Sequence, residues 1–153
     1  MWRFGGFDGE RELGGVVDFF DVEEGSWGRV EFEEGPGARS VGGFVAVRVG
    51  GGEEDGKKGK DYLVVVFGEA DPSSIGHEGA GRMLGDVWAF DVEEERWVRV
   101  VDDCGDGGGG ERPAPRGWFG AAVAVGPGRL AVVGGLGEDN ERLGDAWVLE
   151  FDG

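Results

Sequence analysis

One stretch of the sequence gathers the side chains best suited to hold a metal ion. Glu69, Asp71 and His77 lie within eight positions of one another, and His77 is the only histidine of the chain. Two carboxylates and one imidazole suit ferrous iron, manganese or zinc with open coordination positions. A plain structural alternative exists, because Asp71 begins an Asp-Pro-Ser-Ser segment typical of turns and a lone loop histidine is usually solvated. The spacing is compatible with a metal site but does not require one.

A second group of candidate residues consists of two arginines and a tryptophan. Arg39 and Arg116 each follow a proline-containing segment and precede a run of small apolar residues, and Trp118 lies two positions after Arg116. These three residues are candidates for binding a substrate. The structural alternative is that the two arginines pair with acids or carbonyls of a neighbouring unit.

The elements that must position these residues are strands. Tyr62–Phe67 is an apolar, β-branched run that ends at a glycine, and Asp86–Asp91 alternates polar and apolar residues. A short polar link joins Asp86–Asp91 to Trp97–Val101, which indicates a hairpin. The segment between the first two strands is longer than its counterparts elsewhere in the chain, and long connections in compact repeats are often functional.

The same pattern occurs three times. The run Phe20-Asp21-Val22-Glu23-Glu24 returns as Phe90-Asp91-Val92-Glu93-Glu94, and Trp27 corresponds to Trp97 at the same spacing. Asp86 and Trp88 correspond to Asp145 and Trp147. Self-similarity of this size, with short strands, GG pairs and tryptophan markers, is typical of propeller blades.

These marks resemble the kelch repeat: an arginine before the first strand, a hydrophobic run closing in GG, an Asp-x-aromatic third strand and a tryptophan that opens the fourth. The resemblance implies an all-β partial propeller with about three four-stranded antiparallel blades. Residues 1–35 would form a partial blade, 36–112 a complete blade with a long 2–3 loop, and 113–153 a blade lacking its fourth strand. The ten expected strands are Trp2–Phe4, Val16–Phe20, Trp27–Phe32, Arg39–Val49, Tyr62–Phe67, Asp86–Asp91, Trp97–Val101, Arg116–Val125, Leu130–Val133 and Asp145–Phe151.

In an antiparallel blade the 2–3 and 4–1 connections leave from the same end. We therefore expect Glu69–Leu84 to share a face with Asp102–Pro115 and with Glu33–Ala38. The first strand of each blade lines the central channel in this architecture. Arg39, Arg116 and Trp118 should then lie near the channel mouth on that face, beside the loop with Glu69, Asp71 and His77.

The segment GE…DP…H followed by Arg116-Gly117-Trp118 is similar to the C-terminal blades of plant nitrile-specifier and thiocyanate-forming proteins and their fungal kelch relatives. The resemblance implies Fe²⁺ held by Glu69, Asp71 and His77, and lyase chemistry that directs glucosinolate-derived thiohydroximate-O-sulfates to nitriles. Trp118 would pack the substrate side chain. The Glu69-to-His77 spacing equals that of the family's E-x3-D-x3-H motif, whereas Asp71 falls two residues after Glu69 rather than four.

The alternative is a non-catalytic kelch module that binds a protein at the channel-mouth face, with Trp118 and Arg116 as anchors. Whether the chain is an enzyme stays open at this point. A net charge of −17 argues against nucleic acid and anionic membranes as partners. The single cysteine, Cys104, excludes an intrachain disulfide and favours a cytoplasmic protein.

Three blades are too few to close a ring, since propellers close with about four to eight. We therefore expect a fragment of a roughly six-bladed protein that self-associates through its open edges. Its two outer blade faces should both be apolar, because each blade buries its faces only against its neighbours.

Overall fold

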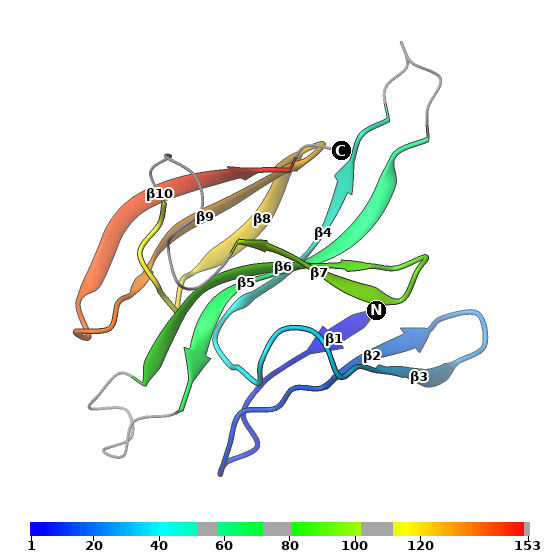
Figure 1. The fold of residues 1–153 in the computed structure, drawn as a ribbon, viewed down its shortest axis with the longest axis horizontal. Helices are drawn as coiled ribbons and strands as arrows, with labels where there is room; N and C mark the ends of the chain where they lie inside the picture. Colours follow the sequence, from blue (N-terminus) through cyan, green and yellow to red (C-terminus); the bar gives the residue numbers. More distant parts are fainter. Residues whose placement is uncertain (52–57, 72–80, 102–111, 152–153) are drawn as a thin grey trace.

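The computed structural model describes residues 1–51, 58–71, 81–101 and 112–151. Within these ranges the chain is built from β-strands joined by turns, and it contains no helix, so no helix long and apolar enough to span a membrane occurs there. Figure 1 shows three sheets in chain order, with the middle one lying between the first, in blue, and the last, in yellow to red.

All three sheets are antiparallel. The first contains β1 (Trp2–Phe4), β2 (Val16–Asp21) and β3 (Ser26–Glu31) in the order β1-β2-β3. The middle sheet contains β4 (Gly43–Val49), β5 (Lys60–Ala70), β6 (Arg82–Asp91) and β7 (Arg96–Val101) in sequence order. The last has the order β10-β9-β8, with β8 (Ala121–Gly126), β9 (Arg129–Leu136) and β10 (Arg142–Glu150). The predicted all-β class and the three antiparallel sheets are confirmed.

The middle sheet is buried on both faces. Alternate side chains of β5 point to opposite sides: Leu63 and Val65 pack toward the first sheet, and Val64 and Val66 toward the last. This arrangement explains why Tyr62–Phe67 reads as a continuous apolar run rather than an alternating one.

The connection between β5 and β6 is shorter than the sequence predicted. Beyond an irregularity at Phe67, strand pairing resumes, with Gly68 opposite Leu84, Glu69 opposite Met83 and Ala70 opposite Arg82. The expected loop Glu69–Leu84 therefore contributes residues at both ends to strands. Glu69 lies on β5, and the connection is reduced to residues 71–81.

The first strands of the middle and last sheets begin later than expected. Strands were predicted to start at Arg39 and Arg116, but β4 begins at Gly43 and β8 at Ala121. The cause is local: Val41 has φ of 48° and Trp118 has φ of 54°, and these left-handed conformations interrupt an extended backbone. His77, most of the segment Gly50–Lys60 and nearly all of Asp102–Arg112 lie outside the described residues.

Candidate functional site

A pair of residues with left-handed backbone angles lies at or near the end of the second strand of each repeat. The φ angles are 68° and 115° at Gly5-Gly6, 56° and 115° at Phe67-Gly68, and 66° and 119° at Gly134-Gly135. Phe67 therefore adopts the conformation for which the other two repeats use glycine. The turn allows pairing to resume one residue later, which places Glu69 on the sheet.

A buried arginine holds this turn in two repeats. Arg39 Nη1 donates to the carbonyl of Phe67 at 3.1 Å and to Asp86 at 2.5 Å, and Arg39 Nη2 donates to Asp86 at 3.0 Å. Arg116 repeats the arrangement, with distances of 3.0 Å to the Gly134 carbonyl and of 2.6 and 2.9 Å to Asp145. These are bidentate, charge-assisted pairs of good geometry.

The indole of the nearby tryptophan completes each pair. Trp88 Nε1 donates to Asp86 at 2.7 Å, and Trp147 Nε1 donates to Asp145 at 2.6 Å. The donors from Arg116 and Trp147 hold the pKa of Asp145 below its usual range. For Asp86, burial acts to raise the pKa, but the hydrogen bonds and charge of Arg39 outweigh it and the pKa is also lowered.

The sequence suggested that Arg39 and Arg116 either bind a substrate or pair with acids or carbonyls of a neighbouring unit. Both side chains are buried, and they pair with acids and carbonyls of their own sheet rather than of a neighbouring one. What crosses between sheets is the backbone: Gly6 N–H donates to the Arg39 carbonyl at 2.8 Å, and Gly68 N–H to the Arg116 carbonyl at 2.9 Å. Contact of Arg39 with a substrate would require its release from Asp86.

The carboxylate of Glu69 is buried and held at both oxygens. The residue is 6% exposed. Oε1 accepts from the backbone N–H of Gly81 at 2.5 Å, and Oε2 accepts from Trp118 Nε1 at 2.8 Å. Gly81 is required there, because a Cβ on it would lie 2.5 Å from Glu69 Oε1 and 2.6 Å from the Asp71 carbonyl. Both donors to Glu69 are neutral.

Trp118 reaches Glu69 from the last sheet. Its backbone N–H donates to the Val41 carbonyl at 3.0 Å, and its left-handed φ turns the chain just before β8. Trp118 is 48% exposed. An indole held at one end by a buried acceptor, with about half of its surface facing solvent, is a positioned apolar contact surface.

Glu69 and Trp118 both differ in type from the residues at the equivalent positions of the other repeats. The residue that follows the left-handed pair is Phe7 in the first repeat and Leu136 in the last, whereas the middle repeat has Glu69. The residue two positions after the arginine is Val41 in the middle repeat and Trp118 in the last. The acid and the indole that break the pattern are hydrogen-bonded to each other across two sheets.

No lysine or arginine of the described residues lies within ion-pair distance of Glu69. Burying a carboxylate without a cation is unfavourable by several kcal/mol in real proteins. Buried charges are usually paired or coordinate a metal. Among the buried acids of the described residues, Asp18, Asp86 and Asp91 each pair with a lysine or arginine, whereas Glu69 does not.

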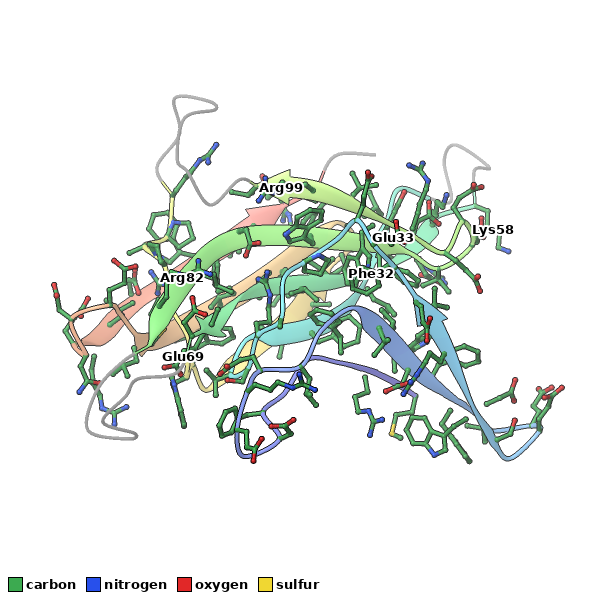
Figure 2. The ribbon with its side chains drawn as sticks, turned by 60° about the horizontal axis from the view of Figure 1, so that its bottom comes forward. Phe32, Glu33, Lys58, Glu69, Arg82 and Arg99 are labelled. Atoms are coloured by element: carbon green, nitrogen blue, oxygen red, sulfur yellow. The ribbon has the colours of Figure 1, made fainter. Side chains whose placement is uncertain are left out.

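The remaining predicted ligands are placed differently. Asp71 follows the end of β5, with a left-handed φ of 52°, an exposed side chain and an ion pair to Arg82 Nε at 3.1 Å. Figure 2 shows Glu69 and Arg82 at one end of the middle sheet, far from Lys58 at the other. His77 lies outside the described residues. No grouping of three His, Cys, Asp or Glu side chains that could hold a metal occurs in the ranges searched, which exclude His77.

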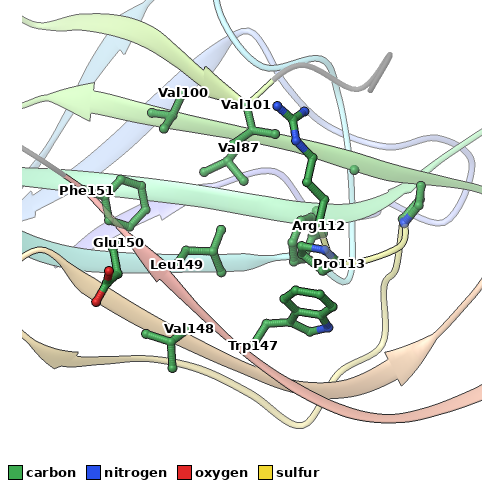
Figure 3. A pocket seen from close by; sticks show the side chains of 13 residues that line it. Val87, Val100, Val101, Arg112, Pro113, Trp147, Val148, Leu149, Glu150 and Phe151 are labelled. Carbon is green, nitrogen blue, oxygen red and sulfur yellow. The ribbon is translucent and has the colours of Figure 1, made fainter. Parts of the chain in front are cut away.

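A separate cavity of about 310 Å³ lies between β6, β7 and β10, and includes Val87, Val100, Leu149 and Phe151 (Figure 3). Its lining is mainly apolar, and none of the predicted site residues contributes to it. A second cavity of about 430 Å³, next to residues 11–15 and 32–38, also excludes them. The Glu69–Trp118 contact lies outside both cavities.

Sequence reasoning placed the segment with Glu69 beside Trp118, and the hydrogen bond between the two side chains agrees with that placement. It missed Asp86, Asp145 and Gly81, which position them. The recurring Asp-x-Trp pattern was visible in the sequence, but its buried arginine partner lies 47 residues away in the middle repeat.

No family model matches the chain. A 70-residue stretch is 37% identical to multiple epidermal growth factor-like domains protein 8 of Rattus norvegicus, Mus musculus and Homo sapiens. The stretch covers 45% of this chain and 2% of each of these relatives. The match is a likeness of one segment to a small part of much longer proteins.

Proposed function

We propose that the chain is part of a kelch-type β-propeller whose Glu69–Trp118 site binds Fe²⁺ and directs glucosinolate-derived thiohydroximate-O-sulfates to nitriles, as in the specifier proteins it resembles. The propeller part is supported by three consecutive antiparallel sheets that share one turn geometry. It is also supported by the Arg–Asp–Trp arrangement that recurs in the middle and last sheets. We place the protein in the cytoplasm, with neither nucleic acid nor membrane as partner, because of its acidity and single cysteine.

The observation that carries the metal proposal is the burial of Glu69 with neutral donors only. Each carboxylate oxygen has two lone pairs, and one on each oxygen is used by Gly81 and Trp118. The other two are available to a cation. Glu69, with Asp71 directly after the same strand and His77 further along the sequence, offers the oxygen and nitrogen donors that ferrous iron accepts.

The residues of the chain have distinct roles in this proposal. A bound Fe²⁺ supplies Lewis-acid polarisation of the substrate. Arg39 is a positioning residue, because it fixes the Phe67-Gly68 turn from which Glu69 projects. The exposed part of Trp118 packs the apolar side chain of the substrate.

The product distribution tests this activity. We expect the chain with Fe²⁺ to raise the nitrile fraction formed from a thiohydroximate-O-sulfate, and expect Glu69→Gln and His77→Ala to abolish the increase. Glu150→Gln is the matched control, because Glu150 is an exposed acid paired with Arg129. Full activity in a Glu69→Gln/His77→Ala double variant would refute the proposal.

A second candidate is a protein-binding module at the same face. It is favoured by the half-exposed, anchored indole of Trp118, since tryptophan is enriched among residues that dominate interfaces. The two candidates differ in their response to chelation. Partner binding that persists with a chelator and is lost in Trp118→Ala would favour the module.

A further inference from the structure

The last sheet exposes an aliphatic outer surface. Val123 and Val125 of β8, Val133 of β9 and Val148 of β10 are between 48% and 57% exposed and form what we call the valine face. Ala131 is paired with both Val123 and Val148, so these side chains project to one side of the sheet. Leu130 and Val132, which alternate with them, are fully buried on the other side.

The valine face corresponds to a surface that is covered in the middle sheet. The left-handed turns align Val133 with Val66, and strand register then aligns Val123 and Val125 with Val45 and Val47. In the middle sheet this surface forms the hydrophobic core shared with the last sheet. On the middle sheet, the equivalent surface is the one that packs against the last sheet. The valine face is therefore the surface of the last sheet on which a further sheet would pack in the same way.

The first sheet exposes the complementary half. Met1, Phe20, Val22 and Trp27 lie on its outer side and form what we call the aromatic face; Met1, Val22 and Trp27 are more than half exposed. They correspond to Leu63, Phe90, Val92 and Trp97, which pack against the first sheet. Trp27 is 52% exposed, whereas Trp97 is 9% exposed.

The aromatic face already has the geometry of its buried counterpart. The rings of Phe20 and Trp27 are 5.4 Å apart with an interplanar angle of 58°. Those of Phe90 and Trp97 are 5.1 Å apart at 56°. Docking this face would thus require little rearrangement, which lowers the entropy lost on association.

The outer side of the first sheet is not purely apolar, in contrast to the sequence expectation. Asp18 lies between Arg3 at 2.7 Å and Arg29 at 2.9 Å, and the Arg3 guanidinium lies 5.1 Å from the Trp27 ring centroid. Glu31 shares this side of β3 with Trp27 and Arg29, so the positive and negative groups of the surface balance. The two outer faces are therefore chemically different: one is aliphatic, and the other combines aromatic and charged side chains.

We infer that two copies of this chain associate head to tail, with the valine face of each packed on the aromatic face of the other. This contact repeats the packing between sheets inside one copy, so the chain itself carries both halves of the interface. Two copies supply six sheets, within the range of about four to eight at which rings of sheets close. Closure makes the assembly a dimer rather than an open chain.

The net charge of −17 per copy opposes this association. Salt screens the repulsion between two acidic copies, whereas the apolar contact is not weakened by it. We therefore expect the dimer fraction to rise with ionic strength. A fall with added salt would contradict an interface formed by these faces.

Light scattering on the full chain and two variants tests the inference. Val133→Lys/Val148→Lys removes the valine face, and Val22→Asp/Trp27→Ser removes the aromatic face; all four positions are exposed. We expect twice the monomer mass for the unsubstituted chain and the monomer mass for each variant alone. Glu94→Lys, at the exposed tip of the β6–β7 hairpin, should leave the dimer intact.

Mixing the variants gives the sharper result. Each retains one intact face, so the mixture should form a one-to-one heterodimer through a single contact. Dimerisation of the Val22→Asp/Trp27→Ser variant alone would indicate contact between two valine faces and overturn the head-to-tail mode. A monomeric unsubstituted chain at high salt would overturn the inference altogether. Circular dichroism of each variant separates lost association from lost folding.

Discussion

The indole N–H of Trp118 donates to Oε2 of Glu69 at 2.8 Å, and this bond joins the last sheet to the middle one. Both residues occupy positions that the other repeats fill with apolar side chains. A stability argument alone gives no reason to place a buried carboxylate there, because an apolar residue at the same position would fold as well. Metal binding, as proposed above, would be a reason for a carboxylate at this position.

Replacing Glu69 by leucine, the residue of the last repeat at this position, tests that reasoning. Removing a buried carboxylate relieves a desolvation penalty of several kcal/mol. The loss is an unsatisfied Gly81 N–H, which costs about 1–3 kcal/mol, since the half-exposed Trp118 can turn to water. We expect an unchanged or raised melting temperature for Glu69→Leu in metal-free buffer. A clear decrease would show that the carboxylate stabilises the fold without a cation.

Phe67 illustrates a conflict between backbone strain and core packing. Its left-handed φ costs about 1–2 kcal/mol relative to glycine, whereas loss of a buried phenylalanine costs about 3–5 kcal/mol. Phe67 is buried and its ring lies 6.2 Å from that of Phe119. We expect Phe67→Gly to destabilise the chain by about 1–4 kcal/mol in urea unfolding. A gain in stability would show that strain dominates at this turn.

The two arginine–aspartate pairs should respond differently to the same substitution. The Asp86 side chain is 7% exposed, whereas that of Asp145 is 43% exposed. Asp86→Asn leaves Arg39 buried without a counter-charge, which is expected to cost about 3–5 kcal/mol. Solvent around the half-exposed Asp145 screens its ion pair with the buried Arg116, so the loss in Asp145→Asn should be smaller. Urea denaturation of both variants measures this, and an equal or larger loss for Asp145→Asn would contradict the burial argument.

Acid should destabilise the fold through these same aspartates. The pKa values of Asp18, Asp86, Asp91 and Asp145 lie below the ordinary value of 3.8. A carboxyl whose pKa is lower when folded contributes stability above its unfolded pKa and loses it as the pH falls toward the folded value. We expect the melting temperature to drop progressively below about pH 4. Asp145→Asn should flatten this drop, and a profile that is flat in acid for the unsubstituted chain would disagree with the lowered pKa values.

The sequence was sufficient to predict the number of sheets and most strands, because glycine pairs, Asp-x-Trp runs and tryptophan markers recur in one order. It did not predict that β5 continues past Gly68. A glycine after an apolar run reads as a strand end, and only the pairing of Glu69 with Met83 shows that the strand resumes. Glu69 was therefore assigned to a loop although it lies on a strand.

The partners of Arg39 and Arg116 could not be read from the sequence either. Each pairs with an aspartate on the third strand of its own sheet, and that contact depends on register between strands far apart in the chain. The burial of these arginine side chains also depends on contacts between strands far apart in the chain, so it could not be predicted from the sequence either. Arg39 looks like a channel-mouth cation in sequence, but the adjoining turn encloses it.

The most direct test of the metal site is anaerobic titration of Fe²⁺ into the chain by calorimetry. We expect binding of about one equivalent, because the proposed ligands Glu69, Asp71 and His77 make up one set of the kind that ferrous iron accepts. Binding should be lost in Glu69→Gln and in His77→Ala and kept in the exposed control Glu150→Gln. Absence of binding to the folded, unsubstituted chain, or equal binding in all variants, would contradict a metal site at Glu69.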